Sequence, residues 1–544
     1  MNRRQKQKVS DLIKKLRINY NKLLIKKRES KITNEEKHAI VTECLELIGT
    51  KYSELIYKHD GCRVLQSLLK YGNRVQRAKV VDNIKEHYLH LMTTKYSHYL
   101  ASKAYYYAPE PEQKLYFRQI VTRDIHKYII HAYASEVIEY IYNLSSDQER
   151  REMVFAFYGN YFLLLKEVEA DSNATAQRHM ISLKEFLTKK PNLSETILHK
   201  LEKQATKLVE KGLTRHTIVQ AILYDFYQNS TDIERIKNIN DLLKEKLPAL
   251  LASNQGLYVA CACFTMLDAK DRKAVMKTLK EDIKEMFTNR MAHLFLIHII
   301  STLDDTTLSK KKIISELLKA LDELINDKCF QNIFMGIFTP KSKTIFLPEE
   351  IEAFEAFKDK TSSKKPDQVR RLELLKMILK PMETFFEEHL TFYMQDINKN
   401  PLLKGVVKGI IEVGFTDEHH DLVDEFLRQL QKKGQYEKDS EEKGILLGHP
   451  DLHRLLKDLV KQEREQEATV EELPFSKVLA SVIQKNLDDV LKTRAVFIIL
   501  EFIEHQETAK LLLPLIQAKK KEIAAVAKSL PQAKGLQILL SKVK

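Results

Sequence analysis

The chain of 544 residues carries a net charge of +14, with 89 Lys and Arg against 75 Asp and Glu. It contains only 14 Gly and 13 Pro, far fewer than the loops of a β-rich or Rossmann-type enzyme require, so most of it is expected to be helical with short connections. The excess of positive charge favours a polyanionic partner, RNA or DNA.

The cysteines and the apolar runs argue against several protein classes. The five cysteines are odd in number and scattered, which favours reduced thiols in the cytosol or nucleus. No second Cys or His pair stands at a spacing that would complete a zinc site with Cys261 and Cys263, so no metal is expected. The longest apolar runs, such as 294–300 and 495–500, are much shorter than the ~20 residues that cross a bilayer, and no signal peptide is predicted.

Residues 1–35 form a basic N-terminal segment. Residues 1–31 contain twelve Lys and Arg and only two acidic residues. Such a composition is typical of an arm that binds nucleic acid or directs nuclear import. The composition leaves an alternative open, a charged helix whose Leu12, Ile13 and Leu16 dock on the body of the protein.

Residues 36–345 show helical spacing with an internal repeat. Segments such as HDGCRVLQSLLKYG, KYSHYLASKAYYYA and AYASEVIEYIYNLS place apolar pairs in the same columns. The residues that follow the first apolar pair, used here as markers, are Gln66, Ser102, Glu139, Gln220, Cys261 and Ile297, at separations of 36, 37, 81, 41 and 36. The separation of 81 indicates one repeat plus an insertion, around residues 166–192.

A repeat of this size cannot bury its apolar face alone, so the repeats are expected to stack on one another. The predicted fold is therefore all-α, an α-solenoid of armadillo-like helical repeats. The marker helices are expected to form one ladder on its concave side, which is the natural binding surface.

The C-terminal half contains a predicted break followed by weaker repeats. Residues 346–370 carry Pro, Ser and charge, and we interpret them as a linker or long loop. Residues 371–544 are interpreted as degenerate repeats with a terminal cap. Within them HPDLHRLLKDLVKQ matches the marker columns and places Lys457 at the marker.

Each marker helix carries a set of side chains on one face, formed by the marker and the residues four and three before it. The sets are Cys62/Arg63/Gln66, His98/Tyr99/Ser102, Ser135/Glu136/Glu139, His216/Thr217/Gln220 and Leu257/Tyr258/Cys261. They resemble those of the pumilio-repeat (PUF) family. In that family two residues of each set read the edge of one RNA base and one residue stacks on its face, and the resemblance implies pumilio-type repeats here.

When the family's base-reading positions are carried over to this sequence one by one, the resemblance implies that only some of the sets match a base. Cys62 with Gln66 looks like an adenine-reading pair, with Arg63 as the stacking residue. Ser135 with Glu139 is similar to a guanine-reading pair, although Glu136 at the stacking position would repel phosphate. The sets that begin at His98 and His216 match the family in part, and those that begin at Leu257 and His293 depart from it.

The insertion, the segments HDGCRVLQSLLKYG and AHLFLIHIISTLDDT and the long C-terminal extension resemble the nucleolar Puf-A/Penguin branch of this family, over residues 40–544. This resemblance implies an L-shaped stack of repeats rather than a single crescent. It also implies binding of structured or double-stranded RNA or DNA with little sequence preference, and a role in assembly of the large ribosomal subunit. We therefore expect a monomer in the nucleus and nucleolus, with the cytoplasm as a second location, whose partners are pre-rRNA and pre-ribosomal proteins.

If the base code is mostly unused, the phosphate backbone must supply the affinity through Lys and Arg. Besides Arg63, the candidates in or beside the marker helices are Lys58, Lys95, Lys103, Arg123, Lys127, Arg215, Arg290, Arg454, Lys457 and Arg494.

The sequence carries no Walker loop, GxGxxG, HExxH or GxSxG motif, so neither an enzyme nor a cofactor is expected. Two other functions stay open. One is a sequence-specific mRNA-binding protein, a translational repressor or mRNA localisation factor, that reads a single strand through the side-chain sets. The other is a protein–protein scaffold of the armadillo or HEAT type, whose basic face binds acidic peptides.

Overall fold

The computed structural model describes residues 3–24, 33–158, 182–343, 345–395, 401–413, 420–430, 433–435, 443–445, 447, 450–464, 474–529 and 534–543. These residues are helical with short connections, apart from one antiparallel pair of strands. In that pair β1 (Lys433–Gln435) lies against β2 (Lys443–Ile445). The expected all-α solenoid is confirmed. The chain divides into two compact units, Met1–Met266 and Leu267–Lys544, and each is described by itself.

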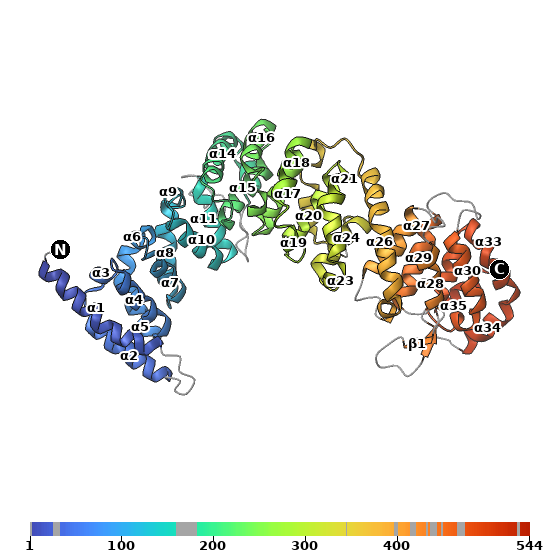
Figure 1. The fold of residues 1–544 in the computed structure, drawn as a ribbon, viewed down its shortest axis with the longest axis horizontal. Coiled ribbons are helices and arrows are strands. Elements are labelled where there is room, and N and C mark those ends of the chain that lie inside the picture. The colour runs from blue at the N-terminus through green and yellow to red at the C-terminus, as the bar shows by residue number, and fades with distance from the viewer. Residues whose placement is uncertain are drawn as a thin grey trace. The chain divides into compact units, whose positions relative to one another are not determined.

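The marker helices of the N-terminal unit form one ladder, in which each helix packs on the next (Figure 1). The ladder helices are α4 (His59–Tyr71), α7 (His98–Tyr107), α10 (Ala134–Leu144), α15 (Thr217–Asn229) and α17 (Asn254–Met266). The longer helices beside them are α1 (Arg3–Leu24), α2 (Asn34–Ile48), α5 (Arg74–Ile84), α8 (Pro111–Arg123), α11 (Asp147–Phe155), α14 (Ser194–Glu210) and α16 (Ile233–Leu243). The short connecting helices are α3 (Tyr52–Leu55), η1 (Lys85–His87), α6 (Tyr88–Thr93), α9 (Ile125–Tyr128), η2 (Ala156–Tyr158), α13 (Leu183–Lys189), η3 (Pro191–Leu193) and η4 (Leu247–Leu250). The predicted stacking of repeats is thus present.

Local sequence signals set where several helices of the N-terminal unit begin. Thr33, Asn73, Ser146 and Ser182 each form a capping box with a Glu or Gln three residues later. Such a box satisfies backbone N–H groups that have no partner inside the helix. Of the expected insertion, residues 166–181 lie outside the described residues, and the part after them contains α13 and η3.

The turn from a short helix into a ladder helix is closed by a contact with a carbonyl six residues earlier. A Cβ added to Gly61 would lie 2.3 Å from the carbonyl oxygen of Leu55, so only glycine fits this approach. Hydrogen bonds of the same span run from Cys62 Sγ to Ile56 O and from Ser97 Oγ to Leu91 O. They satisfy carbonyls at the end of the short helix that would otherwise have no donor.

The C-terminal unit repeats the arrangement with a second ladder (Figure 1). Its ladder helices are α20 (Ala292–Thr302), α24 (Lys328–Phe338), α27 (Pro401–Val413), α29 (Pro450–Arg464), α32 (Val496–Ile503) and α35 (Lys534–Lys542). The longer helices beside them are α18 (Ala269–Thr278), α26 (Asp367–Gln395), α28 (His420–Gln429), α30 (Pro474–Lys485), α33 (Gln506–Ala518) and α34 (Lys520–Ser529). The short elements are α19 (Ile283–Met286), α21 (Thr306–Ser309), the π-helix η5 (Lys310–Ile314), α22 (Ser315–Lys319), α23 (Leu321–Leu324), α25 (Pro348–Glu355), η6 (Lys358–Lys360) and α31 (Leu487–Leu491). Within residues 371–544, predicted as degenerate repeats with a terminal cap, the segment HPDLHRLLKDLVKQ lies in the ladder helix α29.

Glycines bring neighbouring ladder helices of the C-terminal unit close together. A Cβ added to Gly336 of α24 would lie 2.6 Å from the side chain of Ile297 in α20. A Cβ added to Gly405 of α27 would lie 2.7 Å from the ring of Phe338 in α24. The apolar side chains of α20 and α24 thus fill the space that a glycine leaves on the next helix.

The segment interpreted as a linker or long loop, residues 346–370, contains α25 and η6 and packs within the C-terminal unit. Arg370 is 2% exposed, and its guanidinium donates to Asp304 Oδ1 at 2.9 Å and to Ser301 O at 2.5 Å. The hydroxyl of Ser362 donates to Leu267 O at 2.6 Å. Pro, Ser and charged residues are common in linkers, so the composition of this segment gave no sign that it packs. In the sequence, the boundary between the two compact units falls between Met266 and Leu267, outside residues 346–370.

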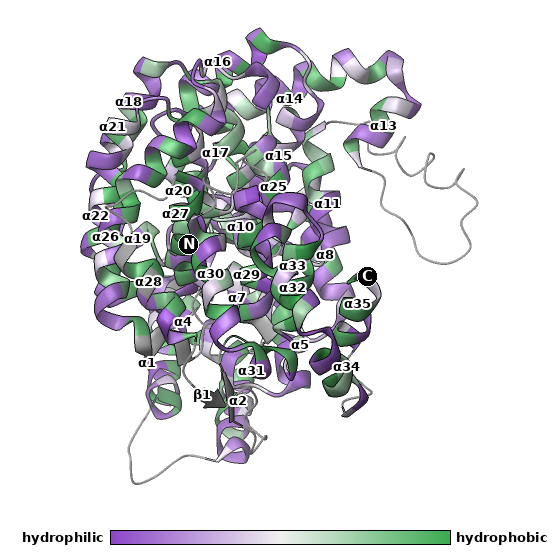
Figure 2. Ribbon diagram, turned by 90° about the vertical axis from the view of Figure 1, so that its right-hand side faces the viewer, coloured by the Kyte–Doolittle hydropathy of each residue, from purple (hydrophilic) through white to green (hydrophobic). Residues whose placement is uncertain are grey.

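Apolar side chains line the inside of each unit, and single helices show both colours in Figure 2 because one face is apolar and the other polar. Ladder helices in the middle of each unit pack on another ladder helix on both sides. The expected L shape stays a prediction.

Candidate nucleic-acid interface

The N-terminal ladder brings one column of the predicted side-chain sets to the surface. Arg63 of α4, Tyr99 of α7 and Glu136 of α10 are exposed, and Tyr99 keeps 61% of its surface in solvent. Thr217 of α15 and Tyr258 of α17 are half-buried. This column is the one that the family resemblance assigns to base stacking, and its exposure agrees with that role.

The expected edge-reading residues Cys62 and Gln220 face inward, so the prediction that they read bases is not supported. Cys62 is 1% exposed, its thiol donates to Ile56 O at 3.0 Å, and burial raises its pKa to about 12. Gln220 is fully buried, and its amide donates to Thr214 O at 2.9 Å and to Ala249 O at 3.1 Å. Both side chains close the turns between helices.

The expected guanine-reading pair Ser135 and Glu139 is also engaged inside the protein. Ser135 is 2% exposed, and its hydroxyl donates to Ala132 O at 3.3 Å. The Glu139 carboxylate accepts from the N–H and the hydroxyl of Thr217, both at 2.7 Å. Because it meets the first residue of α15, Glu139 caps that helix and joins α10 to α15. Its side chain holds the ladder together across the insertion.

The remaining members of the sets are divided between the surface and the interior. Gln66 is half-buried, and Ser102 is half-buried with its hydroxyl donating to His98 O at 3.2 Å. His98 is 8% exposed, with its ring stacked on Tyr133 at 5.1 Å between centroids. His216 lies with Nε2 3.9 Å from Oε1 of Glu136.

Sequence reasoning missed a second column, one turn further along the ladder helices. It contains Lys70 of α4, Tyr106 of α7 and Tyr224 of α15, each four residues after a marker. Tyr106 is 50% exposed, whereas Tyr224 is half-buried with its ring 4.9 Å from that of Tyr258. Continuing the marker alignment by one helical turn would have found these residues.

Lys103 and Tyr140 stand beside this second column. Partial burial and the nearby charge of Lys70 lower the pKa of Lys103. Burial and the neighbouring Tyr106 and Tyr107 raise the pKa of Tyr140. α7 packs on both α4 and α10, so these cations and phenol rings stand on neighbouring helices.

Most of the predicted backbone-contacting cations are exposed, and several lie near the ends of helices. In the N-terminal unit Lys58, Lys95 and Arg215 lie one to three residues before ladder helices, Arg123 ends α8, and Lys127 lies in α9. In the C-terminal unit the exposed members are Arg290, Arg454 and Arg494.

Lys457 departs from the prediction because it belongs to an ion-pair cluster. Its Nζ lies 3.5 Å from Glu501 of α32, and Arg464 Nη1 lies 3.2 Å from the other oxygen of the same carboxylate. Glu501 is 4% exposed. A buried carboxylate requires such partners, so Lys457 and Arg464 stabilise the contact between α29 and α32.

The basic N-terminal segment forms α1 and docks on α2 and α4, which agrees with the docked-helix alternative. Val9, Leu12, Leu16 and Leu23 of α1 are buried, and Ile13 is half-buried. Their spacing puts them on one face of the helix and leaves the lysines outward. Residues 25–32 lie outside the described residues.

Arg63 connects this docked helix to the ladder face. Its guanidinium lies 5.7 Å from the ring centroid of Tyr20 in α1. A cation held over an aromatic ring keeps its charge while its side chain becomes better ordered. Arg63 is thus positioned at the surface next to the basic face of α1.

Two absences hold for the described part of the chain. Among its His, Cys, Asp and Glu side chains, no group of three or more could hold a metal ion. None of its helices has the length and apolar character that crossing a bilayer demands.

Comparisons with known proteins identify the repeat type. A family model described as the CPL (NUC119) domain matches residues 326–472. Human Pumilio homolog 3 is 25% identical over 519 residues, which cover 95% of this chain and 77% of that protein. Pumilio homology domain family member 6 of Schizosaccharomyces pombe is 27% identical over 353 residues, covering 64% of this chain and 53% of that protein.

Solved structures agree in fold. The crystal structure of human Puf-A superposes with a TM-score of 0.76 at 22% identity, covering 98% of this chain and all of that one. The crystal structure of human Puf-A in complex with DNA gives a TM-score of 0.76 at 23% identity, covering 98% of this chain and 99% of that one. The chain is thus similar in sequence to pumilio-repeat proteins over 95% of its length, and it shares the fold of human Puf-A.

Proposed function

We propose that this protein binds RNA or DNA along the N-terminal ladder, mainly through the sugar–phosphate backbone and with little sequence preference. The observation that carries this proposal is that some residues of the side-chain sets bond inside the protein, whereas others are exposed to solvent. Cys62, Ser135 and Gln220, expected to read base edges, bond to backbone carbonyls of the protein itself. The exposed positions carry Arg63 and Tyr99 instead.

The chemistry of the exposed side chains is tolerant of sequence. Lys and Arg attract phosphates whatever the base, and every base has a face on which a tyrosine can stack. Arg63, Lys70 and Lys103 supply the charge, and Tyr99 and Tyr106 supply the rings. A strand that passed over α4 and α7 would meet both kinds of group.

Similarity to human Puf-A supports the same proposal, since that protein has been crystallised in complex with DNA. The contrary feature is the exposed carboxylate of Glu136. It would repel a phosphate placed directly over α10, so the strand is expected to approach α10 through Tyr140 rather than through Glu136.

A titration across salt concentrations tests this function directly. The full chain would be titrated with a single-stranded RNA, a scrambled version of it, and a duplex. Similar affinities for all of them, with log K falling steeply against log salt, are expected because counterions are released from the phosphates. A strong preference for one sequence, lost in Cys62→Ala/Gln66→Ala, would instead favour an mRNA-binding repressor.

We also propose that the protein acts in the nucleolus in assembly of the large ribosomal subunit, in company with pre-ribosomal proteins. Similarity to Puf-A supports this proposal. Depletion is expected to cause accumulation of pre-rRNA intermediates of the large subunit, and a tagged chain is expected to concentrate in nucleoli. Unchanged pre-rRNA processing after depletion would contradict the proposed role without bearing on nucleic-acid binding.

A further inference from the structure

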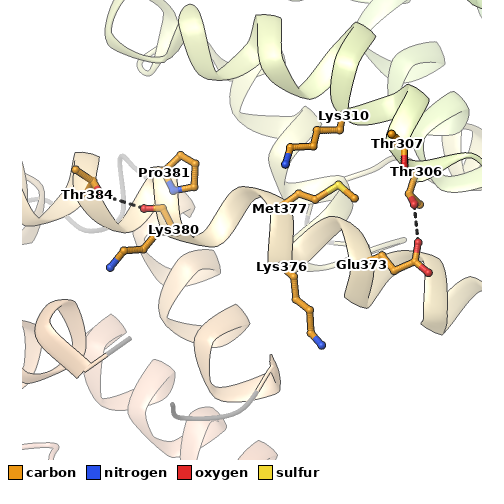
Figure 3. A pocket seen from close by; sticks show the side chains of 9 residues that line it. All are labelled: Thr306, Thr307, Lys310, Glu373, Lys376, Met377, Lys380, Pro381 and Thr384. Carbon is orange, nitrogen blue, oxygen red and sulfur yellow. Dashed lines mark hydrogen bonds between the residues drawn. The ribbon is translucent and has the colours of Figure 1, made fainter. Parts of the chain in front are cut away.

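The C-terminal unit contains a groove that the proposed nucleic-acid interface does not use. Its lining residues are Thr306, Thr307, Lys310, Glu373, Lys376, Met377, Lys380, Pro381 and Thr384 (Figure 3). The first three belong to α21 and η5, and the others follow successive turns of α26. None of these lining residues comes from a ladder helix, so the groove lies in the layer behind the ladder.

The charges along this groove are unbalanced. Its carboxylate, Glu373, is already satisfied because it accepts from Thr306 Oγ1 at 2.5 Å and pairs with Lys365 Nζ at 2.7 Å. Lys310 and Lys376 are exposed, and neither has an ion-pair partner among the described residues. Figure 3 shows these two lysines on opposite sides of Met377. The groove is therefore a positively charged site with an apolar residue between its cations.

The backbone is irregular on both sides of the groove. Lys310 begins a π-helix, a form that occurs mostly as single turns and often at functional sites. Opposite it, Pro381 lies inside α26 and has no N–H, so the carbonyl of Met377 lacks its usual partner four residues later. A ligand that carries N–H donors could use this carbonyl.

The side chains of the groove fit a peptide better than a nucleic acid. The lining contains no Arg and no aromatic residue, and these are the groups that bind phosphate with two bonds and stack on bases. Met377 and Pro381 offer apolar contact instead, and methionine adapts its shape to varied partners. A carboxylate on each side of an apolar side chain would match Lys310, Met377 and Lys376.

We propose that the groove between α21–η5 and α26 binds a short acidic peptide segment of a partner protein, with carboxylates at Lys310 and Lys376 and an apolar side chain on Met377. This site is separate from the ladder, so both ligands can bind at once. It gives the protein a way to hold an acidic protein while its N-terminal unit holds nucleic acid.

The probe for the test is a fluorescein-labelled peptide of repeated Glu-Glu-Leu, whose anisotropy is followed during titration with the full chain at low salt. The variant Lys310→Glu/Lys376→Glu is expected to bind it about tenfold more weakly, because two attractions become repulsions. The matched control is Lys277→Glu/Lys280→Glu, which changes the net charge equally at exposed positions outside the groove. The control is expected to bind as the parent does.

A second variant tests the apolar contact. Met377→Ser leaves all charges in place. It is expected to lower the affinity for the Glu-Glu-Leu peptide by about threefold, since part of the buried apolar area is lost. A peptide of repeated Glu-Glu-Ser is expected to bind the parent and Met377→Ser equally. If Met377→Ser left the affinity for the Leu-containing peptide unchanged, the assignment of Met377 would be wrong.

Each remaining outcome decides the proposal. Absence of peptide binding to the parent chain, or equal losses in the groove variant and the control, would overturn it. Titration of the same variants with a labelled oligonucleotide separates this site from the ladder. If the groove variant lost oligonucleotide affinity and peptide and oligonucleotide competed, the groove would be part of the nucleic-acid surface and the proposal would fall.

Discussion

The two ladders share one topology and differ in what their helices show to solvent. In the N-terminal unit α4 and α7 expose Arg63, Tyr99 and Tyr106, whereas residues 292–300 of α20 in the C-terminal unit are all buried. In the first ladder, side-chain hydrogen bonds such as that from Cys62 to Ile56 O hold the turns between helices. In the second, close contacts at glycines, such as Gly405 against Phe338, bring neighbouring helices together. The same repeat can therefore serve as a ligand surface or as a tightly packed support.

The largest expected effect concerns the charge on the first ladder. Replacing Arg63, Lys70 and Lys103 together by Glu should reduce affinity for any oligonucleotide by about a hundredfold, because three phosphate attractions are reversed. Fluorescence anisotropy with two unrelated sequences measures it. The matched triple Lys51→Glu/Lys79→Glu/Lys211→Glu carries the same charge change at exposed positions away from the ladder face and should have less than a tenth of that effect. Equal losses would mean that only net charge matters.

The next effect concerns packing in the second ladder. Gly405→Val should lower the free energy of unfolding of the C-terminal unit by about 3 kcal/mol, because the new side chain would overlap the ring of Phe338. Urea unfolding of the full chain measures it, and Ser481→Val, at an exposed position of α30, is the control. A Gly405→Val chain as stable as the control would show that the helices can move apart freely.

A smaller effect is expected at the bond that joins α10 to α15 in the first ladder. Glu139→Gln should destabilise the protein by about 1–2 kcal/mol, because the charged cap on the N-terminus of α15 is lost. The neighbouring Glu136→Gln, which is exposed, should change stability little. If both substitutions had the same effect on urea unfolding, Glu139 would not be a structural residue.

The smallest effect is a pH dependence in the C-terminal unit. Burial opposes ionisation of Asp304, but hydrogen bonds from Ser363 and Arg370 outweigh it and lower its pKa to about 2. Since the folded value lies below the usual 3.8, the ionised form stabilises the fold above pH 3.8, and this contribution is lost as the pH falls toward 2.

Asp304 is partly exposed, so its contribution is expected to be only about 1 kcal/mol. Unfolding of the parent chain and of Asp304→Asn would be compared between pH 5 and pH 3. The difference in stability between the two chains should shrink as the pH falls. A constant difference would contradict the pKa assignment.

The ladder could be predicted from the sequence because apolar pairs repeat in fixed columns. The column also continues to Ile333, 36 residues after Ile297, and α24 could have been recognised from this spacing. α27 could not, since the long helix α26 stands between it and α24 and breaks the period. The packing of residues 346–370 could not be predicted, because it depends on a contact between Arg370 and Asp304, which are far apart in sequence.

The candidate site was predictable in part for a similar reason. The exposure of Arg63 and Tyr99 follows from helical periodicity, which also places Lys70 and Tyr106 on the same face. The burial of Cys62 and Gln220 and the bonds from Thr217 to Glu139 could not be predicted. A polar side chain can bond to a base or to a carbonyl of its own chain, and only the fold shows which acceptor is near.

Ultraviolet crosslinking of the full chain to a bound oligonucleotide, followed by mass spectrometry, tests most directly whether the first ladder is the nucleic-acid surface. Crosslinked peptides should contain Tyr99, Tyr106 and Tyr140, for more than one oligonucleotide sequence. Crosslinks confined to the C-terminal ladder, or absent from α7 and α10, would contradict the assignment of the first ladder as the nucleic-acid surface.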